Sequence, residues 1–182
     1  PEGGDYSVTP MDGAMLTRML HATLKFDAKI WAQWAYSANV DERGISFVLT
    51  YPELVNSERT TPRSLTQFFE QIASIDDLKG NLQLVEALAL SSLDEVTVSS
   101  FIAFINDELT QLIDPEEILD TEDFKKVAKK IKDISVDDSG AKRVDRLSTM
   151  CARLYLKLIS DNYTQEKNHG KNLVEFLLLD TI

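Results

Sequence analysis

Apolar side chains recur every three or four residues along most of the chain, the spacing that gathers them on one face of an α-helix. Four of these stripes start at Asp27, Asp41, Thr61 and Asp114, residue types that cap helices well, and a proline follows the last two. The pattern predicts nine or ten helices, which begin close to residues 12, 28, 42, 62, 77, 93, 115, 122, 144 and 171.

The second half of the chain carries the most regular stripes. Ser92 forms a capping box with Glu95, which would open a long helix whose inner side extends to Leu109 and Leu112. Thr121 is the expected cap of the next helix. The inner face of that helix would consist of Phe124, Val127, Ala128, Ile131 and Ile134, and the outer face of Lys125, Lys126, Lys129, Lys130 and Lys132.

One short segment departs from the helical spacing. Leu20, Ala22, Leu24 and Phe26 alternate with polar residues, and this period of two predicts a strand over 20–26. A lone strand cannot satisfy its own backbone hydrogen bonds. We therefore expect this strand to be frayed or to pair with something outside the chain.

Composition favours a mainly all-α fold class. Seven Gly and five Pro in 182 residues disfavour a turn-rich β-sandwich or barrel. No apolar run approaches the roughly 20 residues of a membrane span, and no basic segment followed by an apolar stretch suggests a signal peptide. Cys151 is the only cysteine. An internal disulfide framework is therefore excluded, and a reducing, cytoplasmic location is expected.

The formal net charge of −11 is spread unevenly along the chain. Residues 1–60 carry −3, residues 61–120 carry −10 and residues 121–182 carry +2. A chain of this charge is a poor partner for nucleic-acid backbones and anionic membranes. The change of sign favours a boundary near 118–122, although most of these charges are expected to be a solvated helix surface.

Motifs of a complete active site are missing from the sequence. The P-loop GxxxxGK[ST], the dinucleotide loop GxGxxG and the nucleophile elbow GxSxG are absent, and no Cys or His cluster has metal-ligand spacing, so no metal site is predicted.

Arg63 is a candidate for binding an anion. It falls in the first turn of the helix after Thr61, where a cation opposes the helix dipole at a cost of about 0.3–1 kcal/mol. An arginine beside free N–H groups suits a phosphate, and the alternative is a tolerated surface arginine. Arg18 alone is an ordinary surface residue.

Five stretches of the chain occur in a characteristic order. They are GDYSVTPMDGAMLTRM at 4–19, WAQWA at 31–35, FVLTYPEL at 47–54, TTPRS at 60–64, and the segment 91–119 that ends in PEEIL. Together they resemble the end of the ATPase core and the lid of MoxR-like AAA+ ATPases, over roughly residues 3–120. The resemblance implies that 1–26 is the tail of the core, that 27–120 is the helical lid, and that 121–182 is an additional helical segment.

The resemblance also implies a role for each arginine. Arg18 matches the arginine finger, which acts on the nucleotide of the neighbouring subunit. Arg63 matches sensor 2, which contacts the γ-phosphate of the nucleotide in its own subunit. A finger neutralises charge that develops on the γ-phosphate oxygens and contributes roughly 10³–10⁵ in rate in related systems. Met19 stands where the family usually has Phe, a change of a packing residue that leaves Arg18 in place.

On this interpretation the chain is a fragment of a longer ATPase. The P-loop and the metal site would precede Pro1, so ATP and Mg²⁺ belong to the parent protein and neither is expected to bind this chain alone. The implied partners are the upstream core, neighbouring subunits of a ring and a von Willebrand A-type client, with no membrane or nucleic acid. Two other hypotheses stay open: a self-contained helical interaction module whose lysine face at 125–132 meets an acidic partner, and the lid of a DNA-associated AAA+ motor.

Overall fold

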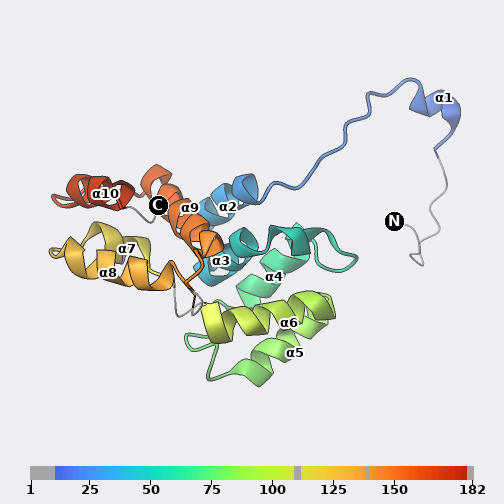
Figure 1. Ribbon diagram of the computed structural model, residues 1–182. Coiled ribbons are helices and arrows are strands. Elements are labelled where there is room, and N and C mark those ends of the chain that lie inside the picture. The colour runs from blue at the N-terminus through green and yellow to red at the C-terminus, as the bar shows by residue number, and fades with distance from the viewer. Residues whose placement is uncertain (1–10, 109–111, 138–139, 180–182) are drawn as a thin grey trace.

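The computed structural model describes residues 11–108, 112–137 and 140–179, and their regular secondary structure is almost entirely helical (Figure 1). The all-α fold class is therefore confirmed. The α-helices are α1 (Gly13–Leu16), α2 (Ala28–Ser37), α3 (Glu42–Thr50), α4 (Pro62–Ile72), α5 (Leu82–Ser92), α6 (Glu95–Ala103), α7 (Pro115–Leu119), α8 (Phe124–Ile134), α9 (Val144–Ile159) and α10 (His169–Leu177). A 3₁₀ turn, η1 (Pro52–Asn56), follows α3, and a π-helical turn, η2 (Phe104–Glu108), extends α6. Among the described residues no helix has both the length and the apolar character needed to cross a bilayer.

Four helices, α2, α3, α4 and α7, begin where the caps predicted, and in the first three the cap side chain accepts a backbone amide. The Asp27 carboxylate accepts hydrogen bonds from the amides of Lys29 and Ile30, at 2.9 and 3.1 Å, and so starts α2. Asp41 caps α3 in the same way. Thr61 caps α4, and Pro62 occupies the first helical position, where its missing N–H removes nothing. These starts are local in origin, because each donor lies within three residues of its acceptor.

Two predicted caps are wrong in position. Ser92 ends α5 instead of opening α6, and Asp94 takes the N-cap position of α6. Thr121 does not cap α8 directly; Asp123 is the N-cap residue, and the Thr121 hydroxyl accepts the Asp123 amide at 3.2 Å. The long helix expected to reach Leu112 is α6 plus the π turn, and Leu109 lies outside the described residues.

The strand predicted over 20–26 is also wrong. Residues 20–27 have no regular secondary structure, and in the described part of the chain β pairing is limited to a single antiparallel bridge between Val136 and Lys142. Alternation of apolar and polar residues favours a strand only where a neighbouring strand supplies the hydrogen bonds. Since the described residues contain no such neighbour for 20–26, the segment stays irregular.

Helices α2 to α6 enclose the first of two hydrophobic cores. Its centre is a cluster of phenylalanines that are at most 1% exposed: Phe47, Phe68, Phe69, Phe101 and Phe104. The ring of Phe101 meets those of Phe47 and Phe68 edge to face, with centroids 5.0 and 5.1 Å apart. Such pairs add about 0.5–1.5 kcal/mol beyond the burial of their area, so this cluster anchors the helices around it.

Helices α7 to α10 enclose the second core. Its buried side chains are Ile113, Ile118, Leu119, Phe124, Val127, Ile131, Leu147, Met150, Leu154 and Phe176. The predicted inner face of α8 lies in this core or against it.

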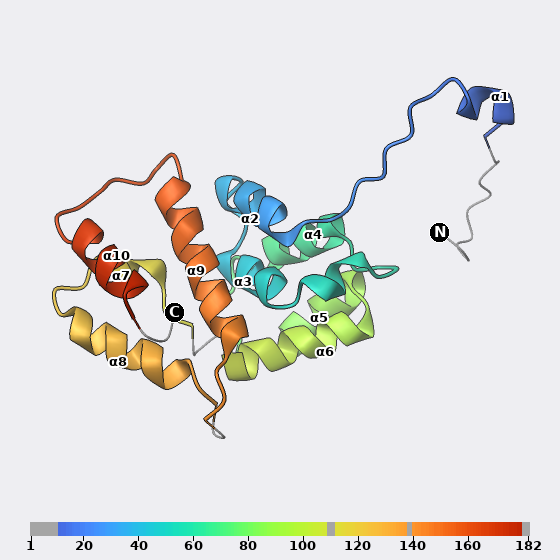
Figure 2. The ribbon, with the colours of Figure 1, turned by 45° about the horizontal axis from the view of Figure 1, so that its top comes forward.

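Helix α9 joins the two cores, and Figure 2 shows it between them. Leu154 packs in the second core, whereas Leu156 packs in the first. Arg153, also in α9, is only 9% exposed. One of its guanidinium nitrogens lies 2.8 Å from Asp114 and 3.3 Å from Glu42. Buried guanidinium groups need such partners, so the pair of ion contacts holds α9 to both halves.

The segment 11–27 stands away from this body. Figure 1 shows α1 separated from α2 by an extended stretch that reaches out from the helices. Its apolar side chains are exposed, and Leu20 and Leu24 reach 103% and 95% of full exposure. Phe26 is the exception, because it packs against the first core.

Candidate functional site

Arg63 lies in the first turn of α4, as predicted, and its side chain is exposed. Thr61 and Ser64 complete a reciprocal capping box ahead of it: the Ser64 amide donates to the Thr61 hydroxyl at 3.2 Å, and the Thr61 amide donates to the Ser64 hydroxyl at 2.8 Å. These bonds leave the amide of Arg63 without a hydrogen-bond acceptor among the described residues. A free guanidinium and a free N–H therefore share one helix end, where the helix dipole favours an anion.

The loop before α4 is held at the corner where α5 ends and α6 begins. The Asp94 carboxylate oxygen Oδ2 accepts from the amides of Arg59 and Thr60, at 3.2 and 2.8 Å, and from the Thr60 hydroxyl at 2.8 Å. The Ser57 hydroxyl donates to the same oxygen. Thr60 is fully buried, and its hydroxyl lies 3.0 Å from that of Thr97.

Partial burial alone would raise the pKa of Asp94, but the hydrogen bonds from Ser57 and Thr60 outweigh it and hold the pKa below its ordinary value. The carboxylate is therefore ionised at neutral pH.

Arg59 binds the other helix end at this corner. Its guanidinium lies 3.0 Å from the Ser91 carbonyl and 3.4 Å from the Leu90 carbonyl, at the C-terminal end of α5, where the dipole favours a cation. The Arg59 carbonyl in turn accepts from the Ser64 hydroxyl at 2.7 Å. The loop that leads to Arg63 is thus tied to α5, to α6 and to the first turn of α4.

Arg18 follows α1 and is exposed in the segment 11–27. Asp12 caps α1 by accepting the Ala14 amide at 3.2 Å, and the His21 ring contacts the Leu16 carbonyl at 2.8 Å. All of these contacts lie within the segment itself. Figure 2 shows that the extended stretch separates α1, which Arg18 follows, from α4, which carries Arg63.

The seven arginines divide into two groups. The guanidinium groups of five arginines have partners. Arg43 binds Asp41, Arg143 binds Asp145, and Arg153 binds Asp114 and Glu42. Arg59 and Arg146 donate to backbone carbonyls, at the end of α5 and at Ile134. Within the described residues, the guanidinium groups of Arg18 and Arg63 have neither a hydrogen bond nor an ion pair. These two are the arginines that the family pattern singled out.

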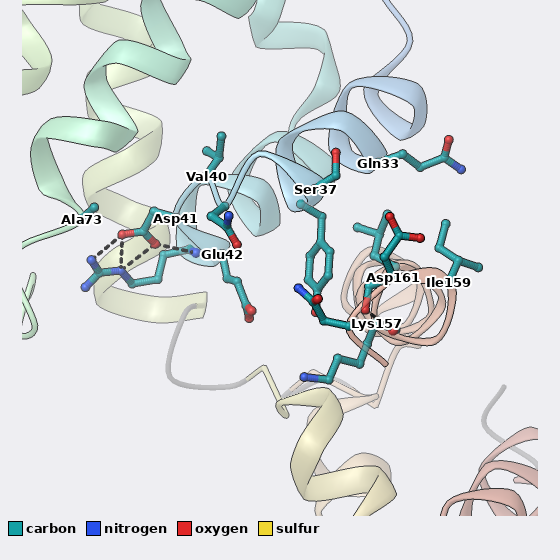
Figure 3. Close-up of a pocket in the computed structure, with 15 residues that line it drawn as sticks. Gln33, Ser37, Val40, Asp41, Glu42, Ala73, Lys157, Ile159 and Asp161 are labelled. Carbon is teal, nitrogen blue, oxygen red and sulfur yellow. Dashed lines mark hydrogen bonds and ion pairs between the residues drawn. The ribbon is translucent and has the colours of Figure 1, made fainter. Parts of the chain in front are cut away.

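A groove of about 810 Å³ separates the α2–α3 turn from the end of α9 (Figure 3). Its charged groups are largely paired: Asp41 with Arg43 at 2.5 Å, and Lys157 with Glu116 at 2.5 Å. The hydrogen bond that Lys157 donates to the Glu116 carboxylate raises the pKa of Lys157. A lysine with a raised pKa stays protonated and is a poor nucleophile or base.

A second polar group surrounds the buried His169, at the start of α10. Candidate ligand atoms of Asp120, Glu166 and His169 lie within 4.8 Å of one another. However, the Glu166 amide donates to Nδ1 of the ring at 3.2 Å, so Nδ1 has no proton and Nε2 carries it. Nε2 then donates to Asp120 at 2.7 Å. Both ring nitrogens are occupied, and the arrangement is explained as a structural tie between α7 and α10 without a metal.

Comparisons with protein families, with curated proteins and with solved structures each find no match to this chain.

Sequence reasoning missed the role of Asp94. Its place in the chain suggested only a helix start, and its hydrogen-bond donors lie 34 to 37 residues away. Helix-cap patterns extend over three or four residues, so no local signal could have identified this contact.

Proposed function

We propose that this chain is the lid region of a MoxR-like AAA+ ATPase, in which residues 1–26 end the ATPase core and residues 121–182 form an additional helical segment. The parent protein hydrolyses ATP with Mg²⁺ in an oligomeric ring, remodels or assembles a partner protein such as a von Willebrand A-type client, and works in the cytoplasm. The P-loop and the metal ligands are supplied by the preceding core. This chain supplies Arg18 and Arg63.

The observation that carries the proposal is the freedom of these two guanidinium groups. The planar guanidinium presents donors in a geometry that matches carboxylate and phosphate groups, and the other five arginines here donate to acceptors within the chain. Arg63 also stands in a helix turn where the dipole disfavours a cation. A phosphate group placed between the Arg63 guanidinium and the free amide of the same residue removes both penalties, which supports a role as sensor 2.

The segment 11–27 supports the role of Arg18 in a different way. Apart from Phe26, its apolar side chains find no cover within the described part of the chain. An ATPase core and a neighbouring subunit would cover them. Arg18, at the end of α1, would then face a nucleotide that this chain does not bind, as an arginine finger requires.

The test is the rate of ATP hydrolysis by the ATPase that contains this chain. Arg18→Ala is expected to lower kcat by about 10³-fold or more, because a finger acts only in the transition state. Arg63→Ala is expected to lower kcat and to weaken ATP binding as well. Lys125→Ala removes an exposed cation from the outer face of α8 and is the control, with hydrolysis expected to be unchanged. Unchanged hydrolysis in both arginine variants would refute the proposal.

A helical interaction module is the second candidate function, and one observation favours it. Lys125, Lys129 and Lys132 are exposed on α8, whereas Lys130 already pairs with Glu117. This surface suits an acidic partner, and its binding would weaken steeply with salt. Salt-dependent capture by an acidic partner in a protein without ATPase activity would favour this candidate.

A further inference from the structure

We propose that Asp94 is the positioning residue for Arg63. It anchors the loop 57–60, and that loop fixes where the first turn of α4 begins. The catalytic consequence of this inference rests on the proposed function, but the structural claim does not. Asp94 touches no part of the proposed nucleotide site, so it acts only through the residues that connect it to Arg63.

The Asp94 side chain binds the loop 57–60 and does not cap its own helix. An aspartate at an N-cap position normally accepts a hydrogen bond from the second or third amide of its own helix. In α6 the Asp94 side chain makes no such bond, and its Oδ2 receives four donors from residues 57–60 instead. The hydrogen bonds of the Asp94 carboxylate therefore hold the loop that precedes α4, and none of them caps α6.

A short series of hydrogen bonds connects this loop to the turn that carries Arg63. Thr60 is anchored to Asp94, and Thr61, the next residue, is the cap of α4. The Ser64 hydroxyl donates back to the Arg59 carbonyl at 2.7 Å and accepts from the Thr61 amide at 2.8 Å. The turn that carries Arg63 is therefore bonded on both sides to residues that Asp94 holds.

Buried contacts keep the loop from shifting as a unit. Thr60 and Thr97 are 0% and 1% exposed, and Leu93 beside Asp94 is 1% exposed. A buried polar network of this kind is specific when every member is satisfied, and loses its order when one member is removed. Loss of the Asp94 charge is thus expected to loosen the start of α4 before it affects the phenylalanine cluster.

The first test is amide hydrogen exchange of the 182-residue chain carrying Asp94→Asn. Asparagine keeps the shape and the N-cap preference of aspartate but removes the charge. The informative amides are those of Ser64 and Leu65, which bond to Thr61 within the Arg63 turn and not to Asp94. We expect their exchange to accelerate about tenfold, the effect of one lost hydrogen bond on local opening, while amides of α2 keep their rates.

Glu95→Gln is the matched control, because Glu95 is the adjacent exposed carboxylate of the same helix. It should leave exchange at Ser64 and Leu65 unchanged. Thr60→Val is a second variant that keeps the buried volume and removes the hydroxyl donor, and it should accelerate the same amides by a smaller factor. Unchanged exchange at Ser64 and Leu65 in Asp94→Asn, or an equal acceleration in Glu95→Gln, overturns the proposal.

The second test is a double-variant cycle in the ATPase that contains the chain. Asp94→Asn should lower kcat, and adding it to Arg63→Ala should cause no further loss, because the turn then has nothing left to position. Losses that multiply would overturn the link between the two residues. If Arg63→Ala alone leaves hydrolysis unchanged, the proposed sensor 2 role of Arg63 fails, and the exchange result still decides whether Asp94 holds the turn.

Discussion

The guanidinium groups of Arg18 and Arg63 both lack partners within the described part of the chain, but the regions that carry them are built differently. The Arg63 turn is bonded to α5 and α6 through Arg59, Thr60 and Asp94. Around Arg18, residues 11–26 form hydrogen bonds only with one another within the described part of the chain, and Leu20 and Leu24 are exposed. The described residues therefore position the turn that carries Arg63, whereas they form no hydrogen bond or ion pair with the Arg18 side chain. Under the proposed function, Arg63 acts on the nucleotide of its own subunit and Arg18 on that of a neighbour, and the neighbour would supply the missing contacts.

The largest contrast between the two regions should appear in stability. Phe101→Ala removes the central ring of the phenylalanine cluster and is expected to lower the free energy of unfolding by about 3–5 kcal/mol. Leu24→Ala removes an exposed side chain and should change it by less than about 0.5 kcal/mol. Urea titration followed by the fluorescence of Trp31 and Trp34 measures both. A large loss in Leu24→Ala would show that the segment 11–27 packs on the body.

A single methyl group should also destabilise the first core. Gly44 is the third residue of α3, and a Cβ atom added there would stand 2.4 Å from the ring of Phe69. Gly44→Ala is therefore expected to cost about 1–3 kcal/mol through overpacking, despite the better helix propensity of alanine. Gly13→Ala in α1 is the matched control, since its Cβ would meet nothing within 4 Å. Thermal unfolding of the two variants decides the point.

Stability should depend on pH through Asp94. Its pKa is lower in the folded chain than in the unfolded chain, so its contribution is complete above the unfolded value and is lost as the pH falls through the folded one. At pH 7 we expect Asp94→Asn to be less stable than the wild type by about 1 kcal/mol. The difference should shrink below about pH 4. Urea titrations across this range test it, and a gap that does not change with pH would contradict the assignment.

The smallest expected effect compares two helix caps. Thr61→Ala removes the cap of α4 and should lower the free energy of unfolding by about 1 kcal/mol. Asp12→Ala removes the cap of α1, which contacts no part of the body, and global stability should not change. Circular dichroism during thermal unfolding measures both, and equal losses would mean that α1 belongs to the cooperative unit.

Local signals predicted much of the fold, and tertiary contacts explain where they failed. The caps at Asp27, Asp41 and Thr61 were predictable because each bond spans three residues at most. Ser92 was chosen over Asp94 because the capping-box pattern cannot register a carboxylate committed to a distant loop. The strand at 20–26 failed for the opposite reason, since alternation needs a partner strand.

The candidate site divides in the same way. The position of Arg63 in a first turn followed from Thr61 and Pro62, which are adjacent in the sequence. The lack of a partner for the Arg63 guanidinium could not be predicted, because the sequence does not tell which of the seven arginines will find partners once the helices pack. The hydrogen bonds between Asp94 and the loop 57–60 could not be predicted either, because they join residues that are far apart in the sequence.

The most direct test of the central claim mixes two variants of the proposed ATPase, each expected to be inactive alone. Each Arg18→Ala subunit has an intact Arg63 but no finger, and each Arg63→Ala subunit has the reverse defect. If Arg18 serves the neighbouring subunit and Arg63 its own, an equal mixture forms some intact pockets and recovers on the order of a quarter of the wild-type rate. A mixture as inactive as its two components would contradict the account.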